Sequence, residues 1–123
     1  MCGIVGVVSA LDITERKWLK NASETLFHRG PDHSGEWWSK DNKAGFAHQR
    51  LSILDLSSSA NQPMYFTKKN ICIVFNGEIY NYRKLRKKLQ TLGHEFKTNS
   101  DTEVLLASYA QWGTECPKYL DGM

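Results

Sequence analysis

The sequence has little of what membrane and secreted proteins need. Its longest apolar stretches, Ile4 to Val8 and Ile71 to Phe75, are far too short to span a bilayer. The opening residues contain no basic segment followed by an apolar one, so we find no signal peptide. We therefore expect a cytoplasmic protein that has no membrane partner.

Cysteine is scarce as well. The chain has three cysteines, Cys2, Cys72 and Cys116, which are an odd and widely spaced set. No Cys-x-x-Cys pair occurs, and the four histidines do not lie at ligand spacing from the cysteines. This pattern is typical of a reducing compartment, without a disulfide framework. We expect no metal site.

The excess of positive charge is small, with a net charge of +3, and much of it lies between Arg83 and Lys88. These basic residues alternate with leucines at helical spacing, which favours the solvated face of a helix. A nucleic-acid patch is the weaker alternative, and it predicts steeply salt-dependent binding. We expect no nucleic-acid partner.

The 123 residues fit one domain with a hydrophobic core. Strands are expected at Cys2–Val8, Glu36–Trp38, Gly45–Leu51 and Ile71–Phe75, the first of them buried. Helices are expected at Thr14–Phe27, with Trp18, Ala22 and Leu26 inward, at Tyr82–Leu92, with Leu85, Leu89 and Leu92 inward, and from the capping box Ser100–Glu103 to Trp112. Because strands and helices do not alternate regularly, the fold class is α+β.

Cys2 is a candidate nucleophile. Removal of Met1 would leave a thiol and a free α-amine on one residue, and the amine titrates near pH ~8, close to the ~8.5 of a free thiol. The amine can therefore take the thiol proton, so no histidine partner is needed. The alternative is a buried strand cysteine without a chemical role.

Several blocks, in order along the chain, resemble the class II glutamine amidotransferases, which are N-terminal nucleophile hydrolases. The start Met-Cys-Gly-Ile-Val-Gly and the block His28–Asp32 are similar to that whole group. Three further stretches resemble specifically the glutaminase domain of the glutamine-hydrolysing asparagine synthetases. They are Arg50–Ser57 with Gln62–Met64, Phe75–Tyr82, and Gly93–Phe96 with Ser100–Leu106.

The resemblance implies a role for each catalytic residue. The Cys2 thiolate would attack the side-chain amide carbon of L-glutamine, releasing ammonia and leaving a thioester for water to hydrolyse. The side-chain amide of Asn76 and the backbone N–H of Gly77 would hold the oxyanion. Asn-Gly is also a common hairpin turn, which is the alternative for these two residues.

The resemblance also implies a binding site for the amino-acid end of glutamine. Arg50 would bind the α-carboxylate, for which a planar guanidinium is well suited. A surface arginine is the alternative. Asp101 and Glu78 would take up the α-ammonium, although an acid at a helix start is favoured by the helix dipole anyway. Backbone groups would shape the pocket at Leu51, Ile53 and Leu54.

At the level of the whole protein, the resemblance implies an αββα sandwich of antiparallel sheets. Residues 1–123 would form the N-terminal part of it, incomplete at the C-terminus, with the synthetase domain absent. That domain would bind ATP and magnesium and use the ammonia to make asparagine from aspartate; we expect no cofactor in this part. Open sheet edges suggest a homodimer. The alternatives are amidation of another carboxylate, for example in a surface polysaccharide, and a non-catalytic scaffold.

Overall fold

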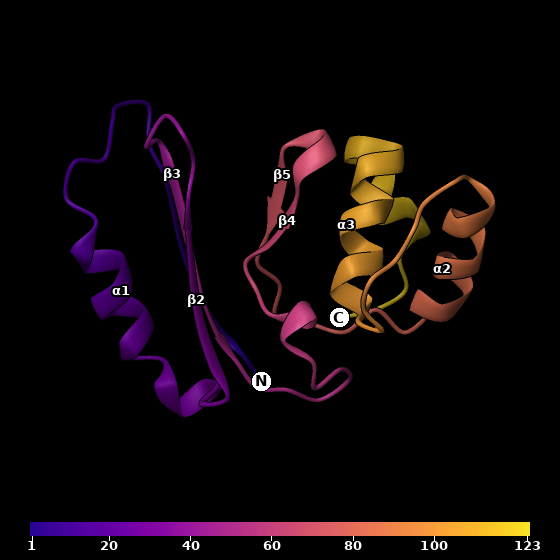
Figure 1. Cartoon of the computed structure of the whole chain (residues 1–123), viewed down its shortest axis with the longest axis horizontal. Coiled ribbons are helices and arrows are strands. Elements are labelled where there is room, and N and C mark those ends of the chain that lie inside the picture. The colour runs from indigo at the N-terminus through magenta and orange to yellow at the C-terminus, as the bar shows by residue number, and fades with distance from the viewer. The chain divides into compact units, whose positions relative to one another are not determined.

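The computed structural model describes all residues, 1–123, and divides into two compact units (Figure 1). Unit 1 comprises Met1–Ser52, Asn61–Pro63 and Val74–Asn76, and unit 2 comprises Ile53–Ala60, Met64–Ile73 and Gly77–Met123. Each unit contains one antiparallel sheet and α-helix. The predicted α+β class with antiparallel sheets is therefore confirmed.

The sheet of unit 1 has three strands in the order β1-β3-β2, which places β3 in the centre. They are β1 (Gly3–Val8), β2 (His33–Trp38) and β3 (Ala44–Arg50). Gly3 pairs with Gln49, and His33 pairs with Arg50. The prediction that the first strand is buried is wrong, because Ile4 and Val8 are 46% and 78% exposed. β1 is an edge strand, and α1 packs on the face that carries Gly3, away from Ile4.

Helix α1 (Lys17–Glu24) covers this one face of the sheet through Leu19 and Ser23, which are buried. The predicted start at Thr14 is wrong. The carboxylate of Glu15 accepts a hydrogen bond from the Lys17 N–H at 2.9 Å, so the helix begins later. Trp18 was expected to face inward, but it is 37% exposed, because its neighbour Leu19 meets the sheet instead.

Unit 2 contains the hairpin of β4 (Met64–Phe66) and β5 (Ile71–Ile73), against which α3 packs. No sequence pattern predicted β4. β5 ends two residues earlier than predicted, since the N–H of Phe75 is bound to the side chain of Gln62 rather than to a neighbouring strand.

The core of unit 2 lies between α2 (Tyr82–Thr91) and α3 (Asp101–Trp112). Leu85 and Leu89 are buried as predicted, but Leu92 is 49% exposed because it follows the last turn of α2. Ser100 caps α3 by accepting the N–H of Glu103 at 3.2 Å, which confirms the capping residue. None of the helices is both long enough and apolar enough to cross a membrane.

Candidate functional site

Cys2 lies immediately before β1, and its thiol contacts the main chain where β3 ends. The N–H of Leu51 donates to Cys2 Sγ at 3.3 Å, and Sγ lies 3.6 Å from the carbonyl oxygen of Leu51. Cys2 is half-buried. The structure thus brings together two of the predicted site residues and fixes the sulfur beside the residue that follows Arg50.

The main chain around Leu51 is held by the loop that precedes β2. The N–H of Asp32 donates to the carbonyl of Arg50 at 3.0 Å, and its carboxylate accepts the N–H of Ser52 at 2.7 Å. A Cβ at Gly30 would lie 2.4 Å from the carbonyl oxygen of Gln49, so only glycine fits there. The sequence analysis assigns these residues to the block His28–Asp32 and does not predict that they support the main chain around Cys2.

Arg50 is buried at the end of β3, so the alternative of a surface arginine is wrong. Its Nη1 donates to Oδ1 of Asn61 at 2.7 Å. Strand alternation puts Arg50 and His48 on the sheet face opposite α1, because Gln49, between them, contacts Ser23 of α1. A buried guanidinium needs polar partners, and the Asn61 carboxamide is one of them.

Asn76 follows a main-chain segment that is hydrogen-bonded on both sides. The alternative that Asn76-Gly77 forms a hairpin turn is wrong, since the next element after β5 is α2 and not a paired strand. Phe75, directly before Asn76, is bound through its N–H and its carbonyl to Gln62, and its carbonyl is also bound to His48. Sequence reasoning assigned no positioning role to either side chain.

Both residues predicted to bind the α-ammonium lie in unit 2. Asp101 is 6% exposed at the first position of α3, and its Oδ2 accepts the N–H of Ile79 at 3.0 Å. This bond ties the start of α3 to the segment that carries Gly77 and Glu78. Glu78 is exposed, and its N–H and carbonyl pair with Met123.

The predicted site residues divide between the two units. Unit 1 contains Cys2, Arg50, Leu51 and Asn76, and unit 2 contains Ile53, Leu54, Gly77, Glu78 and Asp101. Ile53 and Leu54 are 63% and 50% exposed, and the role of their backbone groups in the pocket stays a prediction.

The two histidines near Arg50 are held neutral. Burial, reinforced by the charge of Arg50, lowers the pKa of His48 to about 4 and also lowers the pKa of His33. Both imidazoles are therefore uncharged at neutral pH, so Arg50 is the only full positive charge of this trio. No group of three or more His, Cys, Asp or Glu side chains is arranged to hold a metal ion.

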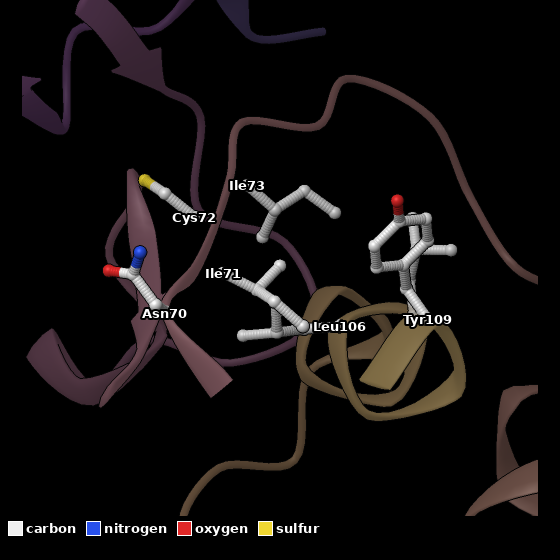
Figure 2. A pocket seen from close by; sticks show the side chains of 7 residues that line it. Asn70, Ile71, Cys72, Ile73, Leu106 and Tyr109 are labelled. Carbon is white, nitrogen blue, oxygen red and sulfur yellow. The ribbon is translucent and has the colours of Figure 1, made fainter. Parts of the chain in front are cut away.

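The other two thiols have different surroundings. Burial raises the pKa of Cys72 to about 11 and also raises the pKa of Cys116. Cys116 is 2% exposed. Cys72 lines a hollow of about 550 Å³ between β5 and α3, with Ile71 and Leu106 (Figure 2). None of the predicted site residues lines this hollow.

Comparison with known proteins bears on the whole chain. A family model described as a glutamine amidotransferase domain matches residues 1–123. The chain belongs to this family. Membership in the glutamine amidotransferase domain family confirms the resemblance that the sequence blocks predict, and Cys2 is the one cysteine of this member whose thiol contacts the main chain where β3 ends.

Asparagine synthetases from bacteria and plants are similar to this glutamine amidotransferase domain over its whole length. Glutamine-hydrolyzing asparagine synthetase 1 of Bacillus subtilis is 41% identical over 127 residues. The glutamine-hydrolyzing asparagine synthetase of Zea mays is 42% identical over 125 residues. Each match covers 100% of this chain but only 20% of the relative, so the chain spans a fifth of the length of these relatives.

Proposed function

We propose that this chain hydrolyses L-glutamine to glutamate and ammonia through a thioester on Cys2. The observation that carries the proposal is the Cys2 thiol, seated on the main chain of Leu51 beside the buried Arg50, in a member of the glutamine amidotransferase domain family. The thiol that would act as nucleophile and the guanidinium that would bind a carboxylate thus both lie where β3 ends.

The chemistry requires removal of Met1. The freed α-amine of Cys2 takes the thiol proton, and the sulfur attacks the side-chain amide carbon of glutamine. The C–N bond breaks with transfer of a proton to nitrogen, so ammonia leaves, and water then splits the thioester to release glutamate. The Asn76 carboxamide and the Gly77 N–H hold the oxyanion. Each such donor typically lowers the barrier by about 3 kcal/mol.

Recognition uses both charges of the free amino acid. Arg50 binds the α-carboxylate, with backbone groups of Leu51, Ile53 and Leu54 around it. Asp101 and Glu78 bind the α-ammonium. The bond from Ile79 occupies Oδ2 of Asp101, so the ammonium is assigned to the other oxygen. A glutamine within a peptide lacks both charges and would be rejected.

The ammonia, in this proposal, feeds ATP-dependent synthesis of asparagine from aspartate. Residues 1–123 are then the N-terminal part of the glutaminase domain, and a synthetase domain, its partner, binds the ATP and magnesium. The names of the relatives and the fifth of their length that is matched support this interpretation. An assay of the full-length protein with aspartate, ATP and glutamine tests it, and amidation of a different carboxylate would favour the alternative acceptor.

Three finer statements belong to the same proposal. The two antiparallel sheets belong to an αββα sandwich. An experimental structure in which these sheets do not pack on each other would contradict this statement. The unpaired edges of β1 and β2 support a homodimer, and a monomeric mass by light scattering over a wide concentration range would count against it. The free thiols support a cytoplasmic location, which imaging of a tagged chain would test.

The first experiment is an intact mass spectrum after incubation with a diazoketone analogue of glutamine. The expected result is a chain that lacks Met1 and carries one adduct, with no adduct on the Cys2→Ala variant. A processed chain that gains no adduct, and releases no ammonia from glutamine, would contradict the proposal and favour the scaffold alternative.

A second experiment separates the two halves of recognition. Arg50→Met and Asp101→Asn should each raise the KM for glutamine about 100-fold or more, because each removes one charge–charge contact. Asn at position 101 still offers an oxygen to the N–H of Ile79, so a folding defect is avoided. An unchanged KM in either variant would remove that residue from the binding site.

A further inference from the structure

Gln62 binds the main chain of one residue from both sides. Its Oε1 accepts the N–H of Phe75 at 2.6 Å, and its Nε2 donates to the carbonyl of the same residue at 3.2 Å. Gln62 is 7% exposed. Because no water can replace these bonds easily in a buried place, the carboxamide fixes the peptide planes on both sides of Phe75.

His48 adds a third bond to the same segment. Its Nε2 lies 3.3 Å from the carbonyl oxygen of Phe75, and that oxygen can only accept, so Nε2 carries the proton. Nδ1 is buried without a hydrogen-bond partner, so protonating it would create a second buried N–H of the ring, and this one would have no acceptor. His48 is therefore a neutral donor, in agreement with its pKa of about 4.

Phe75 is the residue directly before Asn76, and all four residues belong to unit 1. We propose that Gln62 and His48 are positioning residues that hold the Phe75 main chain so that the Asn76 carboxamide meets the oxyanion. The inference rests on the proposed glutamine hydrolysis, and neither residue touches the substrate.

The physical reason is that an oxyanion donor works only if it is in place before the charge forms. Asn76 lies between secondary-structure elements, so no helix or sheet ladder fixes its backbone. Three hydrogen bonds to the preceding residue supply that rigidity. A displacement of about 1 Å at a catalytic group can cost about 100-fold in rate, which sets the expected size of the effect.

The test uses steady-state glutamine hydrolysis by the full chain and its variants. Gln62→Ala should lower kcat about 100-fold, while KM changes less than about threefold, because Arg50 and its backbone neighbours still bind glutamine. Gln62→Glu keeps an oxygen that accepts the Phe75 N–H, but it places a second carboxylate oxygen, which cannot donate, against the Phe75 carbonyl. This variant should therefore also lower kcat.

His48 offers a conservative rescue. The amide nitrogen of a glutamine side chain reaches the place of Nε2, so His48→Gln should keep kcat within about threefold, whereas His48→Leu should lower it at least tenfold. A merely structural role would not separate these variants by kcat at unchanged KM. If Gln62→Ala does not fold, the His48 pair and Gln62→Glu decide the question.

Gln49 is the matched control. It is a glutamine of the same sheet, 3% exposed, and it bonds Ser23 and Ser34 on the face toward α1. Gln49→Ala should lower the midpoint of thermal unfolding without changing kcat. If the unaltered chain hydrolyses glutamine and Gln62→Ala or His48→Leu keeps full kcat, the positioning role is overturned and the proposed function stands. If the unaltered chain, processed at Met1, does not hydrolyse glutamine, the proposed function fails and this inference fails with it.

Discussion

The two units bury their side chains in different proportions. Unit 1 has only two buried hydrophobic residues, Leu19 and Ala47, against five buried polar ones. Unit 2 has eight buried hydrophobic residues, most of them in or near α2 and α3, against five polar ones. Unit 1 also contains the thiol and the guanidinium of the candidate site.

This difference indicates that the two units depend on different forces. The free energy gained by burying apolar side chains depends little on their orientation, whereas the loss of one partner of a buried hydrogen bond destabilises the fold. Unit 1 should therefore be sensitive to pH and to polar substitution, and unit 2 to loss of apolar volume. Four predictions sharpen or break this contrast, in order of decreasing effect.

Truncation of the unit 2 core should have the largest effect. Leu89 is 0% exposed, so Leu89→Ala should lower the free energy of unfolding by about 2–5 kcal/mol through lost burial and a cavity. Leu92→Ala, at the C-cap of α2, is the control: at 49% exposure it should cost less than about 1 kcal/mol. Urea denaturation measures both. Equal losses would mean that the α2–α3 interface is not the core of this unit.

Acid should act chiefly on unit 1. The folded pKa of His48, about 4, lies below its ordinary 6.5, so the unfolded chain binds more protons between these values. Stability is therefore complete above pH ~6.5 and falls towards pH ~4, by up to about 3 kcal/mol from this residue. His33, whose pKa is also lowered, acts in the same direction. His48→Gln should flatten the curve, and an unchanged pH dependence would mean that His48 is not buried neutral.

Loss of the α3 cap should be a smaller effect within unit 2. Ser100→Ala removes the acceptor for the Glu103 N–H and should cost about 1 kcal/mol. Thr14→Ala is a matched control, because Thr14 lies before α1 and does not cap it. The midpoint of thermal unfolding should be lower for Ser100→Ala than for Thr14→Ala. A larger loss of stability for Thr14→Ala would show that α1 begins earlier in solution.

The smallest effect is expected at an exposed ion pair. Lys20 and Glu24 lie 3.9 Å apart at i,i+4 on α1, with side chains 72% and 61% exposed. Lys20→Ala should change the free energy of unfolding by less than about 0.5 kcal/mol. Adding salt to the unaltered chain should change its free energy of unfolding equally little. A loss comparable to that of Ser100→Ala would mean that surface charge matters more in unit 1 than its burial suggests.

Local sequence signals predicted those elements whose ends are chemically marked. Ser100 and Gly113 mark α3, and Gly93, at φ 89°, follows α2, so both helices were found. β4 was missed because three residues cannot show a period. The start of α1 was misplaced because Glu15 competes with Thr14 for the role of acceptor.

For the site, Cys2 could be named from its position after Met1, and Arg50, Asn76 and Asp101 from the resemblance of the blocks around them to a known family. Their supports could not be. Gln62 lies 13 residues from Phe75, and the bond between Leu51 and Cys2 spans 49 residues. Pairings of this kind depend on how the chain returns through space, and no local pattern records that path. Whether the named residues bind and convert glutamine stays a prediction.

Asn61 and Gln62 are neighbours in the chain, yet they serve two different parts of the candidate site. Asn61 bonds the guanidinium of Arg50, and Gln62 bonds the main chain before Asn76. With the roles proposed for Arg50 and Asn76, one peptide unit would couple substrate binding to the geometry of catalysis. An inserted residue in the loop ahead of it would then shift both contacts together, so substrate affinity and turnover rate would change together.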